Sequence, residues 1–352
     1  MSRFLSEKFG KLIPYVPGEQ PRDQAYIKLN TNESPFPPSP SVTEAINEYE
    51  TGMLNRYSDP TAKSLIYAIA EKYGVKSENV FVSNGSDEAL AFIFNAFFSG
   101  GRSVVFPDVT YGFYPVFADF FGIEYRTVAL DADYRINVED YSDVTENVVI
   151  ANPNAQTGVY LDPERIETLV SQNSDRIVVI DEAYIDFGGV SAVPLIDKYD
   201  NLIVVQTFSK SRNLAGARIG MAFACKELIN DLNTMKFSFN PYNVNRLSLI
   251  AGERAVRDGE YMKKCISEII ESRAYTVGAL EKLDFYVLPS MANFVLARTD
   301  RMSGKELYEG LKSRAILVRH FPDERITDFV RITIGTKEQM RALIEAIEDI
   351  LK

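Results

Sequence analysis

A lysine in the second half of the chain stands just beyond an apolar run, among side chains that can bind an anion. Lys210 follows the apolar run 202–205, and Thr207, Ser209 and Arg218 lie on either side of it. A lysine amine forms imines with carbonyl compounds, including pyridoxal 5′-phosphate, and hydroxyls together with a guanidinium can hold a phosphate. Because a single lysine is usually a solvated charge, we interpret Lys210 as a cofactor lysine only if other residues supply the remaining contacts.

A carboxylate and a tyrosine after an earlier apolar run could complete such a site. The run 177–180 leads into Asp181 and then Tyr184. A carboxylate at this place could pair with a protonated ring nitrogen of the cofactor and keep the ring a good electron acceptor, or it could be a helix N-cap. The Tyr184 hydroxyl could donate to the phenolic oxygen of the cofactor, although a buried core tyrosine would look the same in sequence.

Two more segments offer a phosphate site and an aromatic face. Gly85, Ser86 and Asp87 come after the apolar run 80–82 and open a predicted helix. Free N–H groups at a helix N-terminus bind phosphate, and a well-capped helix without a ligand is the alternative. Tyr111, after the next apolar run, could lie against a planar ring.

Three polar residues further along could contact the cofactor or a substrate anion. Asn154, in the turn 152–158, could aim its amide at a cofactor oxygen, or could simply favour the turn. Arg331 lies inside the apolar run 329–334, where a cation is unfavourable unless it is paired. A bidentate contact with a substrate carboxylate or a structural ion pair would each satisfy it, and both interpretations also apply to Arg319.

The composition is that of a large globular chain and argues against several other kinds of site. The chain has 352 residues, 46% of them hydrophobic, and a formal net charge of −11. Without a basic cluster, this acidity argues against nucleic acid and anionic membranes as partners. The single histidine, His320, excludes Ser-His-Asp chemistry, and the separated Cys225 and Cys265 predict no metal site. No signal-peptide pattern and no membrane-length apolar run is present, so we expect a cytoplasmic protein.

Apolar runs and helical patterns alternate along most of the chain, which predicts an α/β fold with a mostly parallel central sheet flanked by helices. Such sheets bind ligands at the carboxyl ends of their strands, where the polar residues above fall. From about residue 260 a long helical pattern leads into an α+β unit. We therefore expect an N-terminal arm (1–45) that joins the small domain, a large cofactor-binding domain (46–260) and a small C-terminal domain (261–352).

Taken in order, these segments resemble the fold-type I, pyridoxal-phosphate-dependent aminotransferases of class I and II, and within them the histidinol-phosphate aminotransferase family. The resemblance covers nearly the whole chain. Its motifs are Leu29–Pro35, Arg56–Pro60, Gly85–Glu88, Asp181–Tyr184, Thr207–Lys210, Leu214–Gly220, Ala292–Phe294 and Arg331–Gly335. One departure concerns the family pattern Asn-Pro-Asn-Asn-Pro-Thr-Gly, in which Ala155 and Gln156 here replace the third asparagine and the second proline. This change leaves the role of Asn154 open.

The resemblance implies a role for each matching residue. Lys210 would form the Schiff base, Asp181 would pair with the ring nitrogen, and Tyr184 would donate to the phenolic oxygen. The other implied cofactor contacts are Gly85, Ser86, Asp87, Thr207, Ser209 and Arg218 around the phosphate, Tyr111 on the ring, Asn154 near the phenolic oxygen, and Tyr57 from a partner subunit. The implied substrate contacts are Asn32, Arg331 for a carboxylate, and Tyr15 and Arg319 near a distal phosphate. A tyrosine that crosses between subunits implies a homodimer with shared active sites.

The implied reaction is transamination between histidinol phosphate and 2-oxoglutarate in histidine biosynthesis, with Lys210 as the base. An aromatic amino-acid aminotransferase and a threonine-phosphate decarboxylase-like enzyme are the alternatives within pyridoxal-phosphate chemistry. A non-catalytic, pyridoxal-phosphate-binding regulator is weaker, because Lys210, Asp181 and Arg331 are all intact and no DNA-binding segment accompanies them. A cofactor-free scaffold would leave Arg331 in an apolar strand unexplained.

Overall fold

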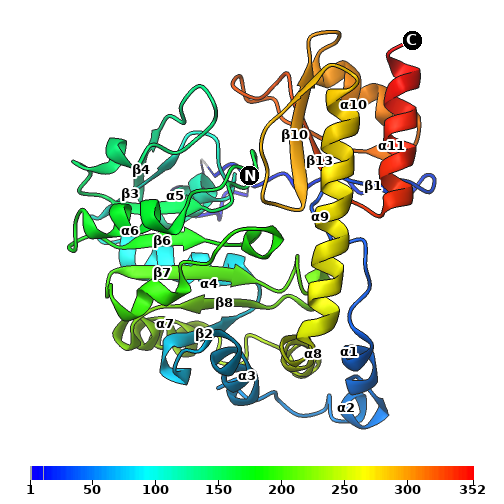
Figure 1. The fold of residues 1–352 in the computed structure, drawn as a ribbon. Coiled ribbons are helices and arrows are strands. Elements are labelled where there is room, and N and C mark those ends of the chain that lie inside the picture. The colour runs from blue at the N-terminus through cyan, green and yellow to red at the C-terminus, as the bar shows by residue number, and fades with distance from the viewer. Residues whose placement is uncertain (1, 11) are drawn as a thin grey trace.

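The computed structural model describes residues 2–10 and 12–352, and its largest element is a seven-stranded sheet (Figure 1). In spatial order its strands are β2 (Val80–Ser83), β8 (Gly220–Phe223), β7 (Leu202–Thr207), β6 (Val178–Asp181), β5 (Asn147–Ala151), β3 (Ser103–Pro107) and β4 (Glu124–Val128). Neighbouring strands from β7 to β4 are parallel, and β8 is antiparallel to β2 and β7. The predicted α/β fold with a mostly parallel sheet is confirmed.

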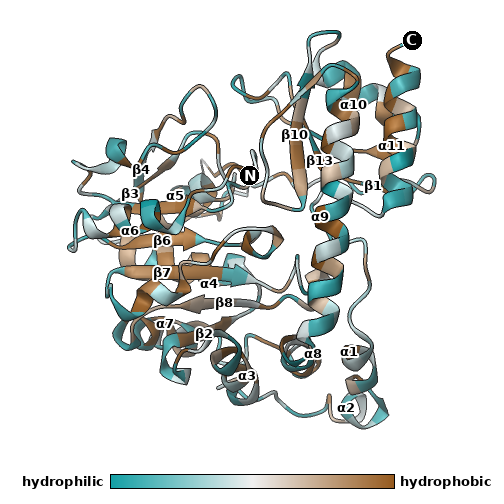
Figure 2. Cartoon of the chain, viewed as in Figure 1, coloured by the Kyte–Doolittle hydropathy of each residue, from teal (hydrophilic) through white to brown (hydrophobic). Residues whose placement is uncertain are grey.

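The inner strands are buried on both faces. Every residue of β2, β5, β6 and β7 is buried, and Figure 2 shows β6 and β7 as largely hydrophobic. Alternate side chains enter two separate cores. Val179 belongs to the core that includes residues of α4 (Ser86–Ile93), α5 (Tyr114–Phe121) and α7 (Lys226–Phe239). Val178 and Ile180 belong to the core that includes residues of α3 (Lys63–Tyr73), α6 (Pro163–Ser171) and α8 (Arg246–Arg257). A sheet between two helical layers needs continuous apolar strands, which is why these runs were visible in the sequence.

Helices cover both faces of this sheet. Those that precede the C-terminal region are α1 (Pro40–Ala45), α2 (Glu48–Gly52), α3 (Lys63–Tyr73), α4 (Ser86–Ile93), α5 (Tyr114–Phe121), α6 (Pro163–Ser171), α7 (Lys226–Phe239) and α8 (Arg246–Arg257). A π-helical turn, Phe94–Phe98, extends α4. Among the residues that the structure describes, no helix combines the length and the apolarity that crossing a membrane requires.

The C-terminal region begins with the long helix α9 (Gly259–Glu281) and forms a four-stranded antiparallel sheet. In spatial order its strands are β12 (Arg319–His320), β13 (Val330–Thr333), β10 (Phe294–Thr299) and β9 (Phe285–Val287). The helices α10 (Gly304–Ser313) and α11 (Lys337–Ile350) each begin with a capping box, at Ser303 and Thr336. The strand register places Arg331 of β13 opposite Arg319 of β12.

The N-terminal arm is held by these C-terminal elements. The short strand β1 (Ile27–Lys28) pairs in parallel with β11 (Ile316–Leu317), and in Figure 1 it lies among the C-terminal strands and helices. Beyond β1, Leu29 N donates to Leu317 O at 2.8 Å, and Thr333 N donates to Leu29 O at 2.9 Å. These backbone bonds fix the arm at Leu29 between β11 and β13.

Candidate active site

A cavity of about 390 Å³ lies at the carboxyl ends of the central strands. Ala151, Asp181 and Thr207 are the last residues of β5, β6 and β7, and all three line the cavity. The N-terminus of α4, the N-terminal arm, and residues around Arg319 and Arg331 form its other walls. Parallel α/β sheets bind ligands at this edge, and the volume suits a small organic molecule.

Lys210 is set on the cavity wall by the loop that follows β7. Its Nζ donates to the carbonyl oxygen of Thr31 at 3.3 Å and lies 5.8 Å from the centre of the Tyr184 ring. Burial, assisted by the positive charge of Arg331, lowers the pKa of the Lys210 amine to about 8. A larger share of the amine is therefore uncharged near neutral pH, and the uncharged amine is the form that attacks a carbonyl or accepts a proton.

Asp181 reaches the cavity from the end of β6 and is almost fully buried, with 5% of its surface exposed. Tyr114 Oη donates to Asp181 Oδ2 at 2.9 Å, and Ala183 N donates to Oδ1 at 3.3 Å. Burial raises the pKa of the Asp181 carboxyl to about 6, although the hydrogen bond from Tyr114 opposes the rise. The sequence reasoning missed Tyr114, because its only signal is a place on an apolar helix.

The N-terminus of α4 and the loop after β7 form an anion cradle. The N-cap residue of α4, Gly85, has no side chain to cap the helix, so the first backbone N–H groups are available to an anion. Arg218 donates to Ser209 Oγ at 3.5 Å and to Asp87 Oδ2 at 3.3 Å. A Cβ atom on Gly85 would lie 2.5 Å from Arg218 Nη2, so glycine is what allows the guanidinium to approach the helix end.

Tyr184 is oriented by a hydrogen-bond chain from the two ends of the protein. Asn32 Nδ2 donates to Tyr184 Oη at 3.0 Å, and Thr333 Oγ1 donates to Asn32 Oδ1 at 3.0 Å. Since the Tyr184 oxygen already accepts from Asn32, its hydroxyl hydrogen is left to donate to a ligand oxygen. Asn32 therefore lines the cavity and also orients Tyr184, a role that the sequence did not indicate.

Tyr111 and Asn154 differ in their access to the cavity. Tyr111 lines it, and its Oη donates to Asp87 Oδ1 at 2.9 Å. Asn154 is not part of the cavity lining. Its Nδ2 donates to Val109 O at 2.9 Å, and its Oδ1 accepts from two backbone N–H groups of its own turn. These hydrogen bonds match the alternative explanation for Asn154, in which the side chain stabilises the turn, and a contact between its amide and a cofactor stays a prediction.

Arg331 enters the cavity from β13 and is held by the loop after β5. Its Nη1 donates to Ala155 O at 3.1 Å and to Gln156 Oε1 at 3.0 Å, whereas Nη2 is 3.5 Å from Asn30 O. The buried Nε has no hydrogen-bond partner within the described residues. No carboxylate of the described chain pairs with Arg331, so the structural ion pair considered above is not formed. Arg331 therefore has unused donors for a substrate anion.

Arg319 and Tyr15 also line the cavity. Arg319 Nη2 donates to Val16 O at 3.1 Å, and Nη1 donates to Pro17 O at 3.2 Å. These contacts fix the arm segment that carries Tyr15. Guanidinium has five N–H donors, so a second anion-binding function for Arg319 is compatible with this structural one.

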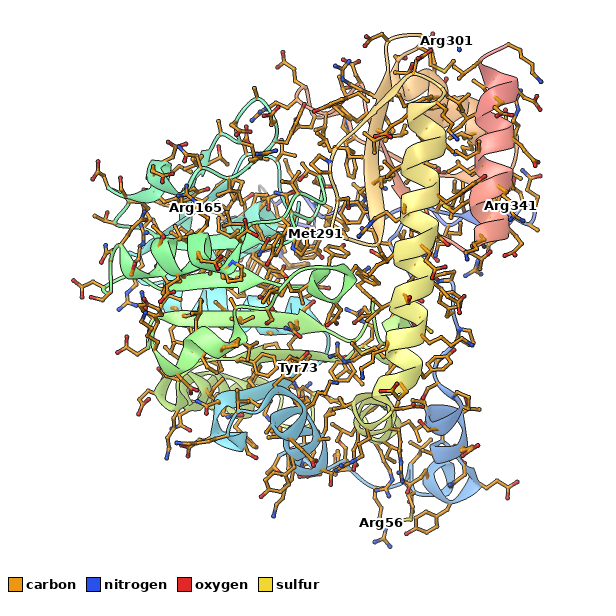
Figure 3. All side chains as sticks on the ribbon, viewed as in Figure 1. Arg56, Tyr73, Arg165, Met291, Arg301 and Arg341 are labelled. Carbon is orange, nitrogen blue, oxygen red and sulfur yellow. The ribbon has the colours of Figure 1, made fainter. Side chains whose placement is uncertain are left out.

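Tyr57 lies outside the cavity lining and is 80% exposed. Its ring stacks on Tyr242 with the ring centres 4.4 Å apart, and Figure 3 shows the neighbouring Arg56 at the lower margin of the molecule. Within one chain Tyr57 does not contact the site, so its predicted contact with a cofactor depends on a second copy of the chain.

The residues around the cavity fit pyridoxal 5′-phosphate. Lys210 offers an amine for the aldehyde, Tyr184 offers a hydroxyl for the phenolic oxygen, and the α4 N-terminus with Arg218 would hold the phosphate. The most specific feature is Asp181, a buried carboxyl without a cationic partner among the described residues. A buried carboxylate needs such a partner, and a protonated ring nitrogen would supply it.

Comparison with known proteins identifies the family. The aminotransferase class I and II family matches residues 24–347, and the chain belongs to it. Within that class it belongs to the histidinol-phosphate aminotransferase family. It is 48% identical over 351 residues to the histidinol-phosphate aminotransferase of Clostridium beijerinckii, covering 100% of this chain and 98% of that protein. It is 46% identical over 353 residues to the one from Brachyspira hyodysenteriae, covering 100% of both.

A solved structure confirms the fold. The crystal structure of histidinol-phosphate aminotransferase from Sinorhizobium meliloti in complex with pyridoxal-5′-phosphate matches with a TM-score of 0.90 and 24% identity, covering 100% of this chain and 98% of that chain. The family match and the curated relatives confirm the resemblance stated from the motifs, and the chain is an aminotransferase of fold type I.

Proposed function

We propose that this chain binds pyridoxal 5′-phosphate and transfers the amino group of histidinol phosphate to 2-oxoglutarate in histidine biosynthesis. The observation that carries the proposal is the pair Arg319 and Arg331, which are register partners on β12 and β13 and both line the cavity. One guanidinium can bind a carboxylate and the other a phosphate. The names of the relatives from Clostridium beijerinckii and Brachyspira hyodysenteriae support the choice of substrate.

The residues of the chain would divide the chemistry as follows. When bound, pyridoxal 5′-phosphate supplies an electron-withdrawing ring that acidifies the substrate carbon bearing the amino group. Lys210 Nζ, with its pKa lowered to about 8, would take the proton from that carbon and deliver it to the C4′ atom of the cofactor. Asp181 would hold a proton on the ring nitrogen through its negative charge, and Tyr184 would donate to the phenolic oxygen.

The two substrates would use different cations. Histidinol phosphate carries a phosphate and no carboxylate, whereas 2-oxoglutarate and its product glutamate carry carboxylates. Arg331 would hold the carboxylate through its unused donors, and Arg319 with Tyr15 would hold the phosphate. Arg319 and Arg331 lie on the C-terminal strands and Tyr15 lies in the arm, and all three line the same cavity. That cavity can therefore accept either substrate in turn.

We further propose a homodimer in which Tyr57 of one subunit contacts the cofactor phosphate of the other. Its 80% exposure and its place outside its own cavity support this arrangement. We also propose a cytoplasmic location, because the proposed substrates are charged compounds that do not cross membranes unaided.

A panel of amino donors tests the function. Purified protein with pyridoxal 5′-phosphate is given 2-oxoglutarate and histidinol phosphate, phenylalanine or phosphothreonine, and both glutamate and carbon dioxide are measured. We expect the highest kcat/KM for histidinol phosphate and no activity in Lys210→Ala. A higher value for phenylalanine would assign an aromatic aminotransferase, and carbon dioxide released from phosphothreonine without an acceptor would assign a decarboxylase.

A further inference from the structure

The side chain of Gln156 contacts the carboxylate-binding arginine directly. Gln156 lines the cavity, and its Oε1 accepts from Arg331 Nη1 at 3.0 Å. A guanidinium has donors and no acceptor, so the oxygen of the amide must face it, and the Nε2 group must face elsewhere. Nε2 forms no hydrogen bond with the described residues, which leaves its two N–H groups for a ligand.

Within the described residues, Gln156 makes the one side-chain hydrogen bond to Arg331, and two backbone carbonyls make the others. The guanidinium lies 5.1 Å from the ring centre of Phe294 and 5.2 Å from that of Phe321. Such aromatic contacts attract the cation but do not fix its rotation within its own plane. Rotation is fixed by edge contacts, and the short ones are those of Nη1 with Ala155 O and Gln156 Oε1, at 3.1 and 3.0 Å.

The unused donors lie on the opposite edge. Nε of Arg331 is buried and unpaired within the described chain, and Nη2 has only a 3.5 Å contact with Asn30 O. These two groups form one side of the guanidinium fork, which matches the two oxygens of a carboxylate. The Gln156 amide is neutral, so it orients the cation without cancelling its charge. A glutamate at this position would cancel that charge.

We propose that Gln156 is a positioning and specificity residue for carboxylate-bearing substrates. It holds Arg331 by the Nη1 edge, so that the Nε–Nη2 edge receives the carboxylate, and its own Nε2 can donate to the same anion. The inference rests on the proposed function in one respect, that one substrate carries a carboxylate and the other does not. Loss of the Gln156 contact should then weaken one half of the reaction and spare the other.

Binding of glutarate, a dicarboxylate that cannot be transaminated, tests the positioning role without turnover. Titration calorimetry on the cofactor-loaded protein compares wild type with Gln156→Met, which keeps the length but removes the acceptor. One hydrogen bond to a charged group corresponds to a rise in Kd of about ten- to a hundred-fold. Gln156→Glu should bind glutarate still more weakly, and Gln24→Met, at an exposed position outside the cavity, should leave the Kd unchanged.

Single-turnover measurements of each half of the reaction test the specificity role. In Gln156→Met, the 2-oxoglutarate concentration for half-maximal rate should rise about tenfold or more, whereas the histidinol-phosphate half should change less than about twofold. An unchanged glutarate Kd, or an equal loss in both halves with histidinol phosphate as donor, would overturn the inference. A different result is expected if the donor that the enzyme prefers is not histidinol phosphate but a compound with a carboxylate. With that donor, Gln156→Met should weaken both halves of the reaction, and the glutarate Kd should still rise. The proposed function would then fail, and the positioning role of Gln156 would stand. If Gln156→Met does not fold, Gln156→Ala replaces it in both experiments.

Discussion

Replacing Asp181 by asparagine should stabilise the cofactor-free protein near and above neutral pH, although it should disable the enzyme. Burial raises the pKa of the Asp181 carboxyl to about 6 from an ordinary value of 3.8. The folded chain therefore holds this proton more tightly than the unfolded chain does. It follows that the free energy of unfolding decreases as the pH rises from about 4 to about 6, and that the full destabilisation is present above pH 6.

The size of the effect follows from the shift in pKa. A difference of about two pKa units corresponds to about 3 kcal/mol at pH 8, and to about half of that at pH 5, where the unfolded-state carboxyl is ionised but the folded one is largely protonated. Asparagine has the same shape and no charge. Its oxygen can accept from Ala183 N, and its amide can donate to Tyr114 Oη, so both contacts are kept, the second with donor and acceptor exchanged.

Urea unfolding of the cofactor-free proteins at pH 5 and pH 8 measures this difference. Asp59→Asn is the control with the opposite sign: partial burial opposes the shift, but hydrogen bonds from Thr61 and Lys63 N outweigh it and lower the pKa of Asp59. That variant should lose stability at pH 8. The reasoning is refuted if Asp181→Asn is less stable than wild type at pH 8, or if its advantage does not grow from pH 5 to pH 8.

Three other predictions concern the loaded enzyme. Lys210→Ala should abolish the pyridoxyl label that borohydride reduction leaves on the wild-type protein, and a label mapped to another lysine would contradict the assignment. Mixed dimers of inactive Tyr57→Phe and Lys210→Ala chains should regain part of the activity, because one of their two sites is intact; sedimentation of a fully active monomer would exclude the shared site. Arg319→Leu should lower kcat/KM for histidinol phosphate by about ten- to a hundred-fold, which is what loss of a charged hydrogen-bonded contact implies. An equal fall for phenylalanine would show that Arg319 acts only by holding the arm.

The central part of the site could be predicted because the sheet is parallel. Asp181 and Lys210 follow continuous apolar runs, and the carboxyl ends of parallel strands meet at one edge, so their proximity follows from the order of elements. Arg331 stood out because a cation inside an apolar strand needs an explanation. The edge strand β4 gave no such signal, since its residues are mostly exposed and its sequence is correspondingly polar.

The contacts between distant segments could not be predicted. The Asn32–Tyr184 and Asn32–Thr333 hydrogen bonds and the Gln156–Arg331 hydrogen bond join residues whose spacing carries no periodicity. Asn154 shows the opposite difficulty, because an amide beside a turn looks the same whether it serves the turn or a ligand. The domain boundaries near residues 45 and 260 stay predictions.

The hydrogen bonds between Asn32 and Thr333, near the two ends of the chain, have a consequence for how the protein folds during synthesis. Asn32 and Thr333 are separated by 301 residues, and closing a loop of that length has an entropic cost of roughly 5 kcal/mol beyond a constant term. During synthesis the anion cradle, formed by the N-terminus of α4 and the loop after β7, can form while the C-terminal strands are still missing. Asn32, which donates to Tyr184, gains its own contact with Thr333 only after β13 has left the ribosome. The anion cradle is therefore complete in the nascent chain before the hydrogen-bond chain that orients Tyr184.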